Sequence, residues 1–219
     1  MFKIVINAHK PANCRVIVSS IALHEPTLSP ADILVVDDNG LRSHPETKDL
    51  PCTFLEGTKP FVFSRNANIG IKHADSDVIL LNDDTELMTR GGFTAMAATH
   101  NVGITTAKIN GPGTYNAAMC SFVAVLIPKS TQDKVGLLDE RFVQYGYEDD
   151  DYCRRVCAAG MAIHLFEACI VNHYHPDRST FHGPNNLYQG DNLVAFDRKY
   201  GIKREYVWPE HLEQIKCPK

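Results

Sequence analysis

Two stretches of the sequence, DILVVDDNG at residues 32–40 and DVILLNDD at residues 77–84, share one design. Each contains an unbroken run of apolar residues that ends abruptly in acids. Unbroken apolar strands are typical of a parallel sheet that helices cover on both faces. Ligands of such sheets bind beyond the carboxyl ends of the strands. The two stretches therefore predict a mainly parallel sheet with both acidic ends, and a ligand site, at one edge.

Strand and helix patterns alternate around these two strands. FKIVINAH (2–9) and CTFLEG (52–57) are β-rich, whereas RVIVSSIALH (15–24) and SRNANIGIKHA (64–74) have helical character. This alternation predicts an α/β fold in which helices connect parallel strands.

The second half of the chain is less regular. GPGTYNAAMCSFVAVLIPK (111–129) has a glycine-rich start and then a strand of about eight residues. AIHLFEACIVNHYH (162–175) predicts one or two strands that end in a pair of histidines. DYCRRVCAAG (151–160) and NLYQGDNLVAFDRKYG (186–201) predict helices, each ending at a glycine.

The composition is that of an ordinary soluble domain. The chain has 219 residues, of which 44% are hydrophobic and 22% charged, and its net charge is −4. Such mild acidity offers no electrostatic footprint for nucleic acid or an anionic membrane. The apolar run in MFKIVINAHKP (1–11) is too short for a signal peptide, and no run approaches the roughly 18 residues of a membrane span. We therefore expect a cytoplasmic protein without a membrane span.

The cysteines predict reduced thiols. Their number is odd and no CxxC motif occurs, so a disulfide framework or a structural zinc site has no support in the spacing. The seven cysteines are Cys14, Cys52, Cys120, Cys153, Cys157, Cys169 and Cys217.

The stretch YGYEDDDYCRR (145–155) holds four consecutive acids where a helix pattern begins. Such a run is commonly a solvated helix start, stabilised by the helix dipole. Here it accompanies acids at two strand ends and the histidines His173 and His175. Carboxylates with one imidazole suit a divalent cation such as Mn²⁺ or Mg²⁺. A cation held by only one or two carboxylates usually takes phosphate as a further ligand.

The order of these motifs resembles that of the family 2 glycosyltransferases, which have the GT-A fold. The resemblance covers roughly residues 2–201. The matching motifs, in order, are ILVVDDNG (33–40), FSRNANIGIKHADSDVILLNDDTEL (63–87), VGLLDERFVQYGYEDDDYCRR (135–155), VNHYHPDRST (171–180) and NLVAFDRKYG (192–201).

The resemblance implies an α/β/α sandwich with a mostly parallel central sheet. It implies a single domain over residues 1–219, with a nucleotide-binding half to about residue 110 and an acceptor-binding half after it. The implied activity is an inverting, Mn²⁺- or Mg²⁺-dependent transfer of a sugar from a UDP-sugar to a hydroxyl of a glycan or glycoconjugate. No nucleic acid is implied as a partner.

The resemblance also assigns residues to the donor. Asp84 matches the metal-binding Asp that ends the family's DxD-type motif. Asn82 stands where the family more often has Asp, and an Asn there can still bond ribose hydroxyls. Asp83, between them, is expected to assist the metal or to face solvent. Asp37 and Asp38 match the positions that recognise uracil and ribose.

The resemblance places one basic side chain and two histidines from late in the sequence beside the donor as well. Arg65 matches a basic residue that reaches the diphosphate. His173 matches the third metal ligand, and His175 is the competing candidate, because alternate residues of a strand share one face.

The resemblance places the acidic run, Glu148 to Asp151, beside the acceptor substrate. By the match, Asp149 is the catalytic base and Glu148 binds acceptor hydroxyls. We expect Asp150 and Asp151 to stabilise the helix start, with Asp151 also pairing with Arg154 or Arg155.

Three alternatives stay open. A retaining GT-A enzyme would share the fold and metal but would not use Asp149 as base. A sugar-nucleotide nucleotidyltransferase would carry a glycine-rich phosphate loop after the first strand, and NAHKPANC (7–14) contains no glycine. A non-catalytic sugar- or metal-binding module would bind without hydrolysing any donor.

Overall fold

The computed structural model describes residues 2–174, 178 and 189–203 of the chain. Its strands are β1 (Phe2–Ala8), β2 (Ile33–Asp37), β3 (Thr53–Glu56), β4 (Asp77–Asn82), β5 (Thr85–Leu87), β6 (Gly103–Asn110), β7 (Tyr115–Asn116), β8 (Met119–Cys120), β9 (Ala124–Ile127) and β10 (Ala162–His173). Its α-helices are α1 (Pro11–His24), α2 (Phe63–Ala74), α3 (Gly92–Ala97), α4 (Lys129–Val135), α5 (Glu148–Ala158) and α6 (Gln189–Tyr200), and short 3₁₀ turns lie at Pro30–Asp32 and Leu41–Ser43.

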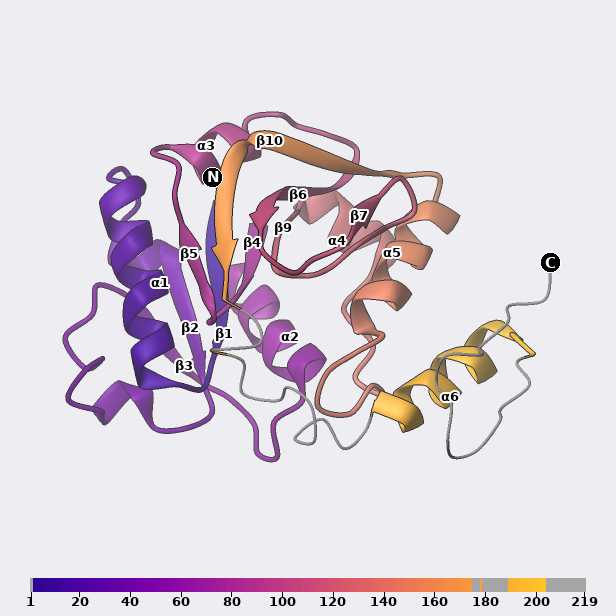
Figure 1. Ribbon diagram of the computed structural model, residues 1–219, viewed down its shortest axis with the longest axis horizontal. Coiled ribbons are helices and arrows are strands. Elements are labelled where there is room, and N and C mark those ends of the chain that lie inside the picture. The colour runs from indigo at the N-terminus through magenta and orange to yellow at the C-terminus, as the bar shows by residue number, and fades with distance from the viewer. Residues whose placement is uncertain (1, 175–177, 179–188, 204–219) are drawn as a thin grey trace.

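One sheet runs through both halves of the described chain (Figure 1). Its strand order is β3-β2-β1-β4-β9-β6-β10-β5, and β7 and β8 form a separate hairpin. The first four strands in this order are mutually parallel, as are β6 and β10, whereas β9 and β5 run antiparallel to their neighbours. The prediction of an α/β fold with a mostly parallel sheet is confirmed.

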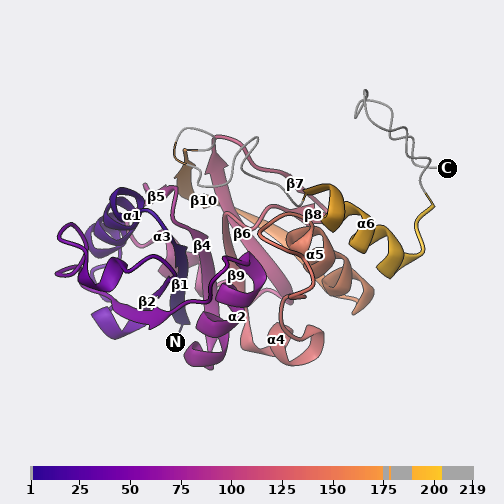
Figure 2. The ribbon, with the colours of Figure 1, turned by 90° about the horizontal axis from the view of Figure 1, so that it is seen from below.

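Two apolar cores, one on each face of the sheet, explain the unbroken apolar strands. In β1, Ile4 and Ile6 join the core under α1 and α3, whereas Val5 joins the core under α2 and α5. Figure 2 shows α1 and α3 on one side of the strands and α2 and α4 on the other. A strand covered on both faces has no solvent face on which to place polar residues.

Helix α1 begins earlier in the chain than the sequence predicted. Helix α1 starts at Pro11, earlier than the expected residue 15, because a proline fits the first helical position, where no backbone N–H is needed.

Helix α2 packs closely on β1 through Gly70. A Cβ on Gly70 would lie 2.3 Å from Cγ1 of Val5, so only glycine permits this approach.

The second half differs more from the prediction. The expected strand of about eight residues is the four-residue β9, because Met119–Cys120 pair back on β7 before the chain enters the sheet. Strand β10 is one strand, with a bulge between Phe166 and Ile170 against β6. The division into two functional halves at about residue 110 stays a prediction, since β9 and β10 complete the sheet that the first half begins.

The chain reverses its direction across the sheet between β1 and β4. It runs outward from β1 to β2 and β3, and then returns to place β4 on the other side of β1. Such a switch point opens a crevice at the carboxyl ends of the strands, where ligands of α/β proteins bind. Asn7 and Asn82 are paired neighbours at these two strand ends.

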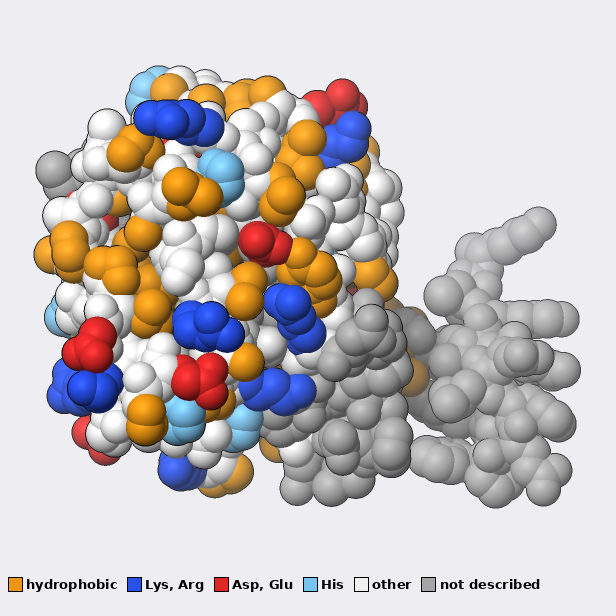
Figure 3. Space-filling model, turned by 60° about the vertical axis from the view of Figure 1, so that its left-hand side comes forward, with side chains coloured by type: hydrophobic (Ala, Val, Ile, Leu, Met, Phe, Trp, Pro, Cys, Tyr) orange, Lys and Arg blue, Asp and Glu red, His pale blue; other side chains and the backbone are white. Residues whose placement is uncertain are grey.

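The surface carries charged and apolar side chains intermixed. On the face in Figure 3, hydrophobic side chains lie scattered among charged and polar ones. Among the described residues, the large exposed hydrophobic side chains are dispersed along the chain: Leu23 lies in α1 and Tyr115 in β7, whereas Met88, Val102 and Val143 lie in connecting segments. No helix in the described ranges has the length and apolar character needed to cross a membrane.

Candidate active site

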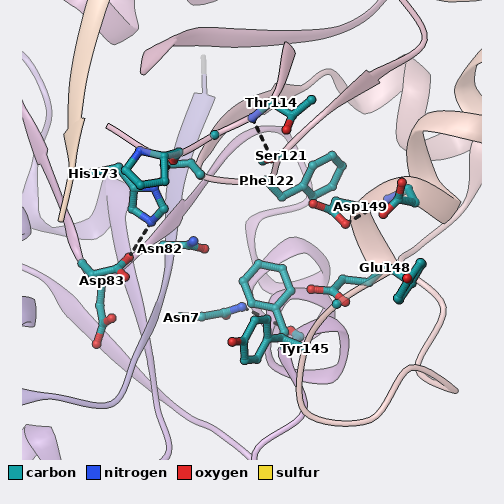
Figure 4. A pocket seen from close by; sticks show the side chains of 18 of the residues that line it. Asn7, Asn82, Asp83, Thr114, Ser121, Phe122, Tyr145, Glu148, Asp149 and His173 are labelled. Atoms are coloured by element: carbon teal, nitrogen blue, oxygen red, sulfur yellow. Dashed lines mark hydrogen bonds and ion pairs between the residues drawn. The ribbon is translucent and has the colours of Figure 1, made fainter. Parts of the chain in front are cut away.

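A pocket of about 560 Å³ lies at the carboxyl ends of β1 and β4. Its volume is in the range of pockets that hold small ligands. In Figure 4, His173 and Asp83 lie on one side of this pocket and Glu148 and Asp149 on the other. The lining residues include Asn7, His9, Phe61, Phe63, Asn82, Asp83, Asp84, Pro112, Ser121, Phe122, Tyr145, Glu148, Asp149, Asp150 and His173.

Asp84 and His173 meet at one wall of the pocket. Asp84 follows β4, His173 ends β10, and the Nε2 atom of His173 lies 3.4 Å from Oδ1 of Asp84. Strand pairing fixes this contact, because His173 is opposite Thr85 in the β10–β5 ladder. Two side chains far apart in the sequence thus converge through backbone hydrogen bonds.

The tautomer of His173 is fixed by the chain itself. Its Nδ1 contacts the carbonyl oxygen of Pro112, which can only accept, so Nδ1 carries a proton. In the neutral ring, Nε2 then presents a lone pair toward the Asp84 carboxylate. Burial lowers the pKa of His173, but the Asp84 carboxylate and the Pro112 carbonyl outweigh it, so that the pKa is raised. Two acceptors at this spacing attract a cation or a proton between them.

Asp84 and His173 could supply two ligands to a divalent cation. An imidazole held by a backbone carbonyl on its far nitrogen is the usual arrangement of a metal-binding histidine. No cluster of three or more His, Cys, Asp or Glu side chains suited to a metal occurs within the part of the chain that the structure describes. The competing ligand His175 lies outside the described residues.

The Asp83 carboxylate does not join Asp84 and His173. It binds the loop between β1 and α1. Its carboxylate accepts the backbone N–H groups of His9 (2.9 Å) and Lys10 (3.1 Å) at the start of α1. Burial and the neighbouring Asp84 charge raise the pKa of Asp83 to about 6, against the opposing effect of these donors. Its geometry ties β4 to the loop after β1, and a part for Asp83 in ligand binding stays a prediction.

Three pocket-lining side chains carry a buried oxygen without a hydrogen-bond partner among the described residues. They are Oδ1 of Asn7, Oδ1 of Asn82 and Oε2 of Glu148. The orientation of Asn7 is settled, because its Nδ2 donates to the carbonyl of Phe63 at 3.2 Å. Buried acceptors without donors are uncommon and costly, and in a pocket they favour a ligand rich in hydroxyl or N–H groups.

The opposite wall holds the acid pair at the first turn of α5. Burial raises the pKa of Asp149 to about 7, and the charge of Asp150 adds to the increase. Burial, with the charge of Asp149, also raises the pKa of Glu148, whose side chain is 5% exposed. A carboxylate that titrates near neutrality is suited to accept a proton from a substrate.

The acids that follow β2 are occupied by the chain itself. Asp37 accepts the backbone N–H groups of Asn39 and Arg42, each at 2.9 Å. Burial alone would raise its pKa, but the backbone donors of its turn lower it. Asp38 is buried and lies 2.8 Å from Nδ1 of His9, and of this pair His9 lines the pocket. Neither Asp37 nor Asp38 is among the pocket-lining residues, and their part in recognising uracil and ribose stays a prediction.

Two further expectations fall outside the pocket lining. Arg65 lies on α2 with its guanidinium Nε 3.6 Å from Glu140. Asp151 is fully buried and binds Nε of Arg155 at 2.8 Å, so its predicted partner is correct. The Asp151 carboxylate also accepts a hydrogen bond from the Tyr200 hydroxyl at 2.8 Å, so it joins α5 to α6 as well as lying in the first turn of α5.

Sequence reasoning missed several pocket residues. Asn7 lies near the end of β1 and His9 follows that strand, and Phe122 and Tyr145 are among the aromatic residues of the lining. A polar Asn at the end of an apolar strand was the available signal for Asn7. No local signal marks Pro112, whose carbonyl orients His173 from a distant loop.

The fold was compared with solved structures. A crystal structure of GalNAc-T7 with UDP, GalNAc and Mn²⁺ superposes with a TM-score of 0.67 over 79% of this chain and 43% of that one, at 13% identity. The structure of S. aureus TarS superposes with a TM-score of 0.58 over 90% of this chain and 39% of that one, at 15% identity. Both are GT-A glycosyltransferases.

The chain has the GT-A fold. It spans about two fifths of the length of each of these GT-A proteins. No protein-family model matches the sequence, and no curated protein matches it either. At these identities the likeness establishes the GT-A architecture and not the chemistry of the pocket.

Proposed function

We propose that this chain is a metal-dependent glycosyltransferase that moves a sugar from a UDP-sugar to an acceptor hydroxyl of a glycan or glycoconjugate, with inversion. The observation that carries this proposal is the arrangement of the pocket. A cation-attracting pair, Asp84 and His173, faces a buried acid pair, Glu148 and Asp149, across one cavity on a GT-A sheet.

The donor diphosphate belongs at the wall formed by Asp84 and His173. With two ligands from the described residues, a Mn²⁺ or Mg²⁺ ion would complete its shell with diphosphate oxygens and water. Such an ion, when bound, offsets the negative charge that grows on the leaving diphosphate. The GalNAc-T7 structure that shares this fold contains UDP and Mn²⁺, which supports the choice of donor and cation.

The nucleoside belongs at the ends of β1 and β4. Asn7 and Asn82 present amide oxygens there that have no hydrogen-bond partner among the described residues, and hydroxyls of a ribose or sugar could donate to them. His9, oriented by Asp38, lies beside them. In this proposal Asn7, Asn82 and His9 contact the nucleoside, a role that the family resemblance assigned to Asp37 and Asp38.

Asp149 is the base for the acceptor. A hydroxyl becomes an effective nucleophile only when a positioned group takes its proton. In the transfer, the acceptor oxygen forms a bond to the anomeric carbon while the bond from that carbon to the diphosphate oxygen breaks. The hydroxyl proton goes to Asp149, and Glu148 holds a neighbouring hydroxyl. One carboxylate opposite the leaving group gives a single displacement, hence inversion.

A screen of nucleotide sugars tests the proposal. We expect Mn²⁺-dependent hydrolysis of at least one UDP-sugar and tighter binding of UDP with Mn²⁺ than in EDTA, measured by calorimetry. Equal affinity in EDTA would contradict the metal assignment. Absence of hydrolysis across all donors, with UDP bound, would instead favour a binding module.

The product distinguishes the two possible stereochemical outcomes. NMR of the transferred sugar reports its anomeric configuration directly. A retained configuration would keep the fold and donor but remove the base role from Asp149.

A further inference from the structure

The loop that leads into the acid pair has an unusual backbone. Gln144 (φ 54°), Gly146 (φ 105°) and Tyr147 (φ 73°) all have left-handed conformations. For residues other than glycine this region costs roughly 1–2 kcal/mol each. Such a conformation persists only where the surroundings hold it. Glu148 follows directly, so the shape of this loop sets where α5 begins.

One side chain of α6 makes four hydrogen bonds to this loop, which is also joined to the start of α2 by a hydrogen bond from the Phe63 N–H to the Gln144 carbonyl (2.6 Å). Asn192 accepts the backbone N–H of Val143 through Oδ1 at 2.8 Å. Its Nδ2 donates to the carbonyls of Val143 (2.8 Å), Tyr145 (3.2 Å) and Gly146 (3.1 Å). Asn192 is 1% exposed, so water cannot substitute for it. Its amide thus satisfies backbone groups that a strained loop cannot pair within itself.

The helix that carries Asn192 is fastened to α5 as well. At its end, Tyr200 donates to the buried Asp151 at 2.8 Å and lies under the guanidinium of Arg154, 4.3 Å from its ring centre. In its middle, the Phe196 ring packs against Tyr147 with 5.6 Å between ring centres. Figure 1 shows α6 beside the lower part of α5 and away from the centre of the sheet.

We propose that Asn192 is a positioning residue for the acid pair: it fixes the loop 143–147 so that Glu148 and Asp149 face the pocket. Asn192 does not line the pocket itself, so it acts on the reaction only through this loop. The inference rests on the proposed function in one respect, because it takes Asp149 as the base whose placement limits the rate.

The test uses two substitutions and a matched control. Asn192→Ala removes every loop contact of the amide, and Asn192→Asp keeps the acceptor for the Val143 N–H while placing an oxygen against three carbonyls. Both should lower kcat for transfer by roughly 10- to 100-fold, because a small misplacement of a catalytic group is costly. KM for the UDP-sugar should change by less than about twofold.

The control is Asn68→Ala. Asn68 is also buried and bonds the N–H (3.0 Å) and carbonyl (2.9 Å) of Leu138, with a further hydrogen bond to the Glu140 carboxylate (2.9 Å), and it is not among the pocket-lining residues. It should lower thermal stability while kcat stays within about twofold of wild type. A kcat for Asn192→Ala equal to that of wild type would overturn the proposal. So would an equal loss of kcat in Asn68→Ala.

Hydrogen exchange read by mass spectrometry gives an answer that does not depend on catalysis. In Asn192→Ala, or in Asn192→Asp if the first variant does not fold, amides of residues 143–150 should exchange faster than in wild type, while those of β1 should not. Unchanged protection of the loop would overturn the proposal. Should the wild type transfer no sugar, the proposed function fails by itself, and this exchange result still decides whether Asn192 holds the loop.

Discussion

The two walls of the pocket carry similar groups but are built differently. Asp84 and His173 stand at strand ends, and the ladders of β4 with β1 and of β10 with β5 fix their approach. Glu148 and Asp149 stand on the first turn of a helix, after a loop with three left-handed residues. The first wall is held by the strand ladders. The second is held mostly by side chains of α5 and α6, with one backbone link from Phe63 to Gln144.

This difference predicts which wall is robust. A strand end is fixed by many hydrogen bonds of the sheet, so a change to one side chain there removes a ligand and leaves the frame intact. The helix start depends on a few buried polar contacts, so its geometry is sensitive to residues that touch no ligand. Variants of the two walls should therefore lose different properties.

The largest effect is expected from Asp149→Asn. The variant keeps the shape of the side chain and loses the proton acceptor, so transfer should fall by at least about 100-fold. UDP affinity in the presence of Mn²⁺, measured by calorimetry, should stay unchanged because this wall faces the acceptor. Transfer at wild-type rate would remove Asp149 from the mechanism.

A second effect belongs to the opposite wall. Asp84→Asn and His173→Ala should weaken Mn²⁺-dependent UDP binding by roughly 10- to 100-fold. In EDTA, the variants and wild type should bind UDP equally. If either variant lowered transfer while leaving Mn²⁺-dependent binding intact, the division of labour between the walls would be wrong.

The third prediction concerns stability and pH. Asp149 has a pKa of about 7 when folded, compared with about 3.9 in an unfolded chain, so the wild type loses stability as pH rises from about 4 to 7. Asp149→Asn lacks this loss. Its melting temperature should match wild type near pH 4 and exceed it by several degrees above pH 7 in thermal denaturation. A constant difference across this range would contradict the raised pKa.

The smallest effect is expected from Asp150→Asn. The Asp150 charge contributes to the raised pKa of Asp149, so its removal should move the rising limb of the pH–rate profile to lower pH. The maximal rate should change little, since a charge at a helix start contributes only about 0.3–1 kcal/mol. Loss of transfer in Asp150→Asn with normal transfer in Asp149→Asn would show that Asp150 is the base.

The sequence predicted the strand-end wall better than the helix-start wall. Unbroken apolar runs report burial on both faces, and the sheet then brings polar residues after them to one edge, as for Asp84. The same rule failed to separate Asp84 from Asp37, because both follow apolar strands. Only the turn after β2, with its N–H groups directed at Asp37, distinguishes them.

The residues around the helix start were harder to predict for a physical reason. The run of acids marks the beginning of α5, but nothing local shows that Asp151 is buried against Tyr200 or that Asn192 binds the loop. These contacts join segments more than 40 residues apart and follow no period of strand or helix. They arise from tertiary packing, which a single sequence does not encode in a readable pattern.

The edge strand β5 has a consequence for how the protein is made. Its partner in the sheet is β10, and Leu87 pairs with Val171. As a ribosome releases the chain from its amino end, β5 emerges long before this partner. The contact between Asp84 and His173 therefore forms only after β10 has left the ribosome. A nascent chain halted before β10 would hold β1 to β4 without the contact between Asp84 and His173, so the proposed Mn²⁺-dependent binding of UDP would require completed synthesis of the sheet.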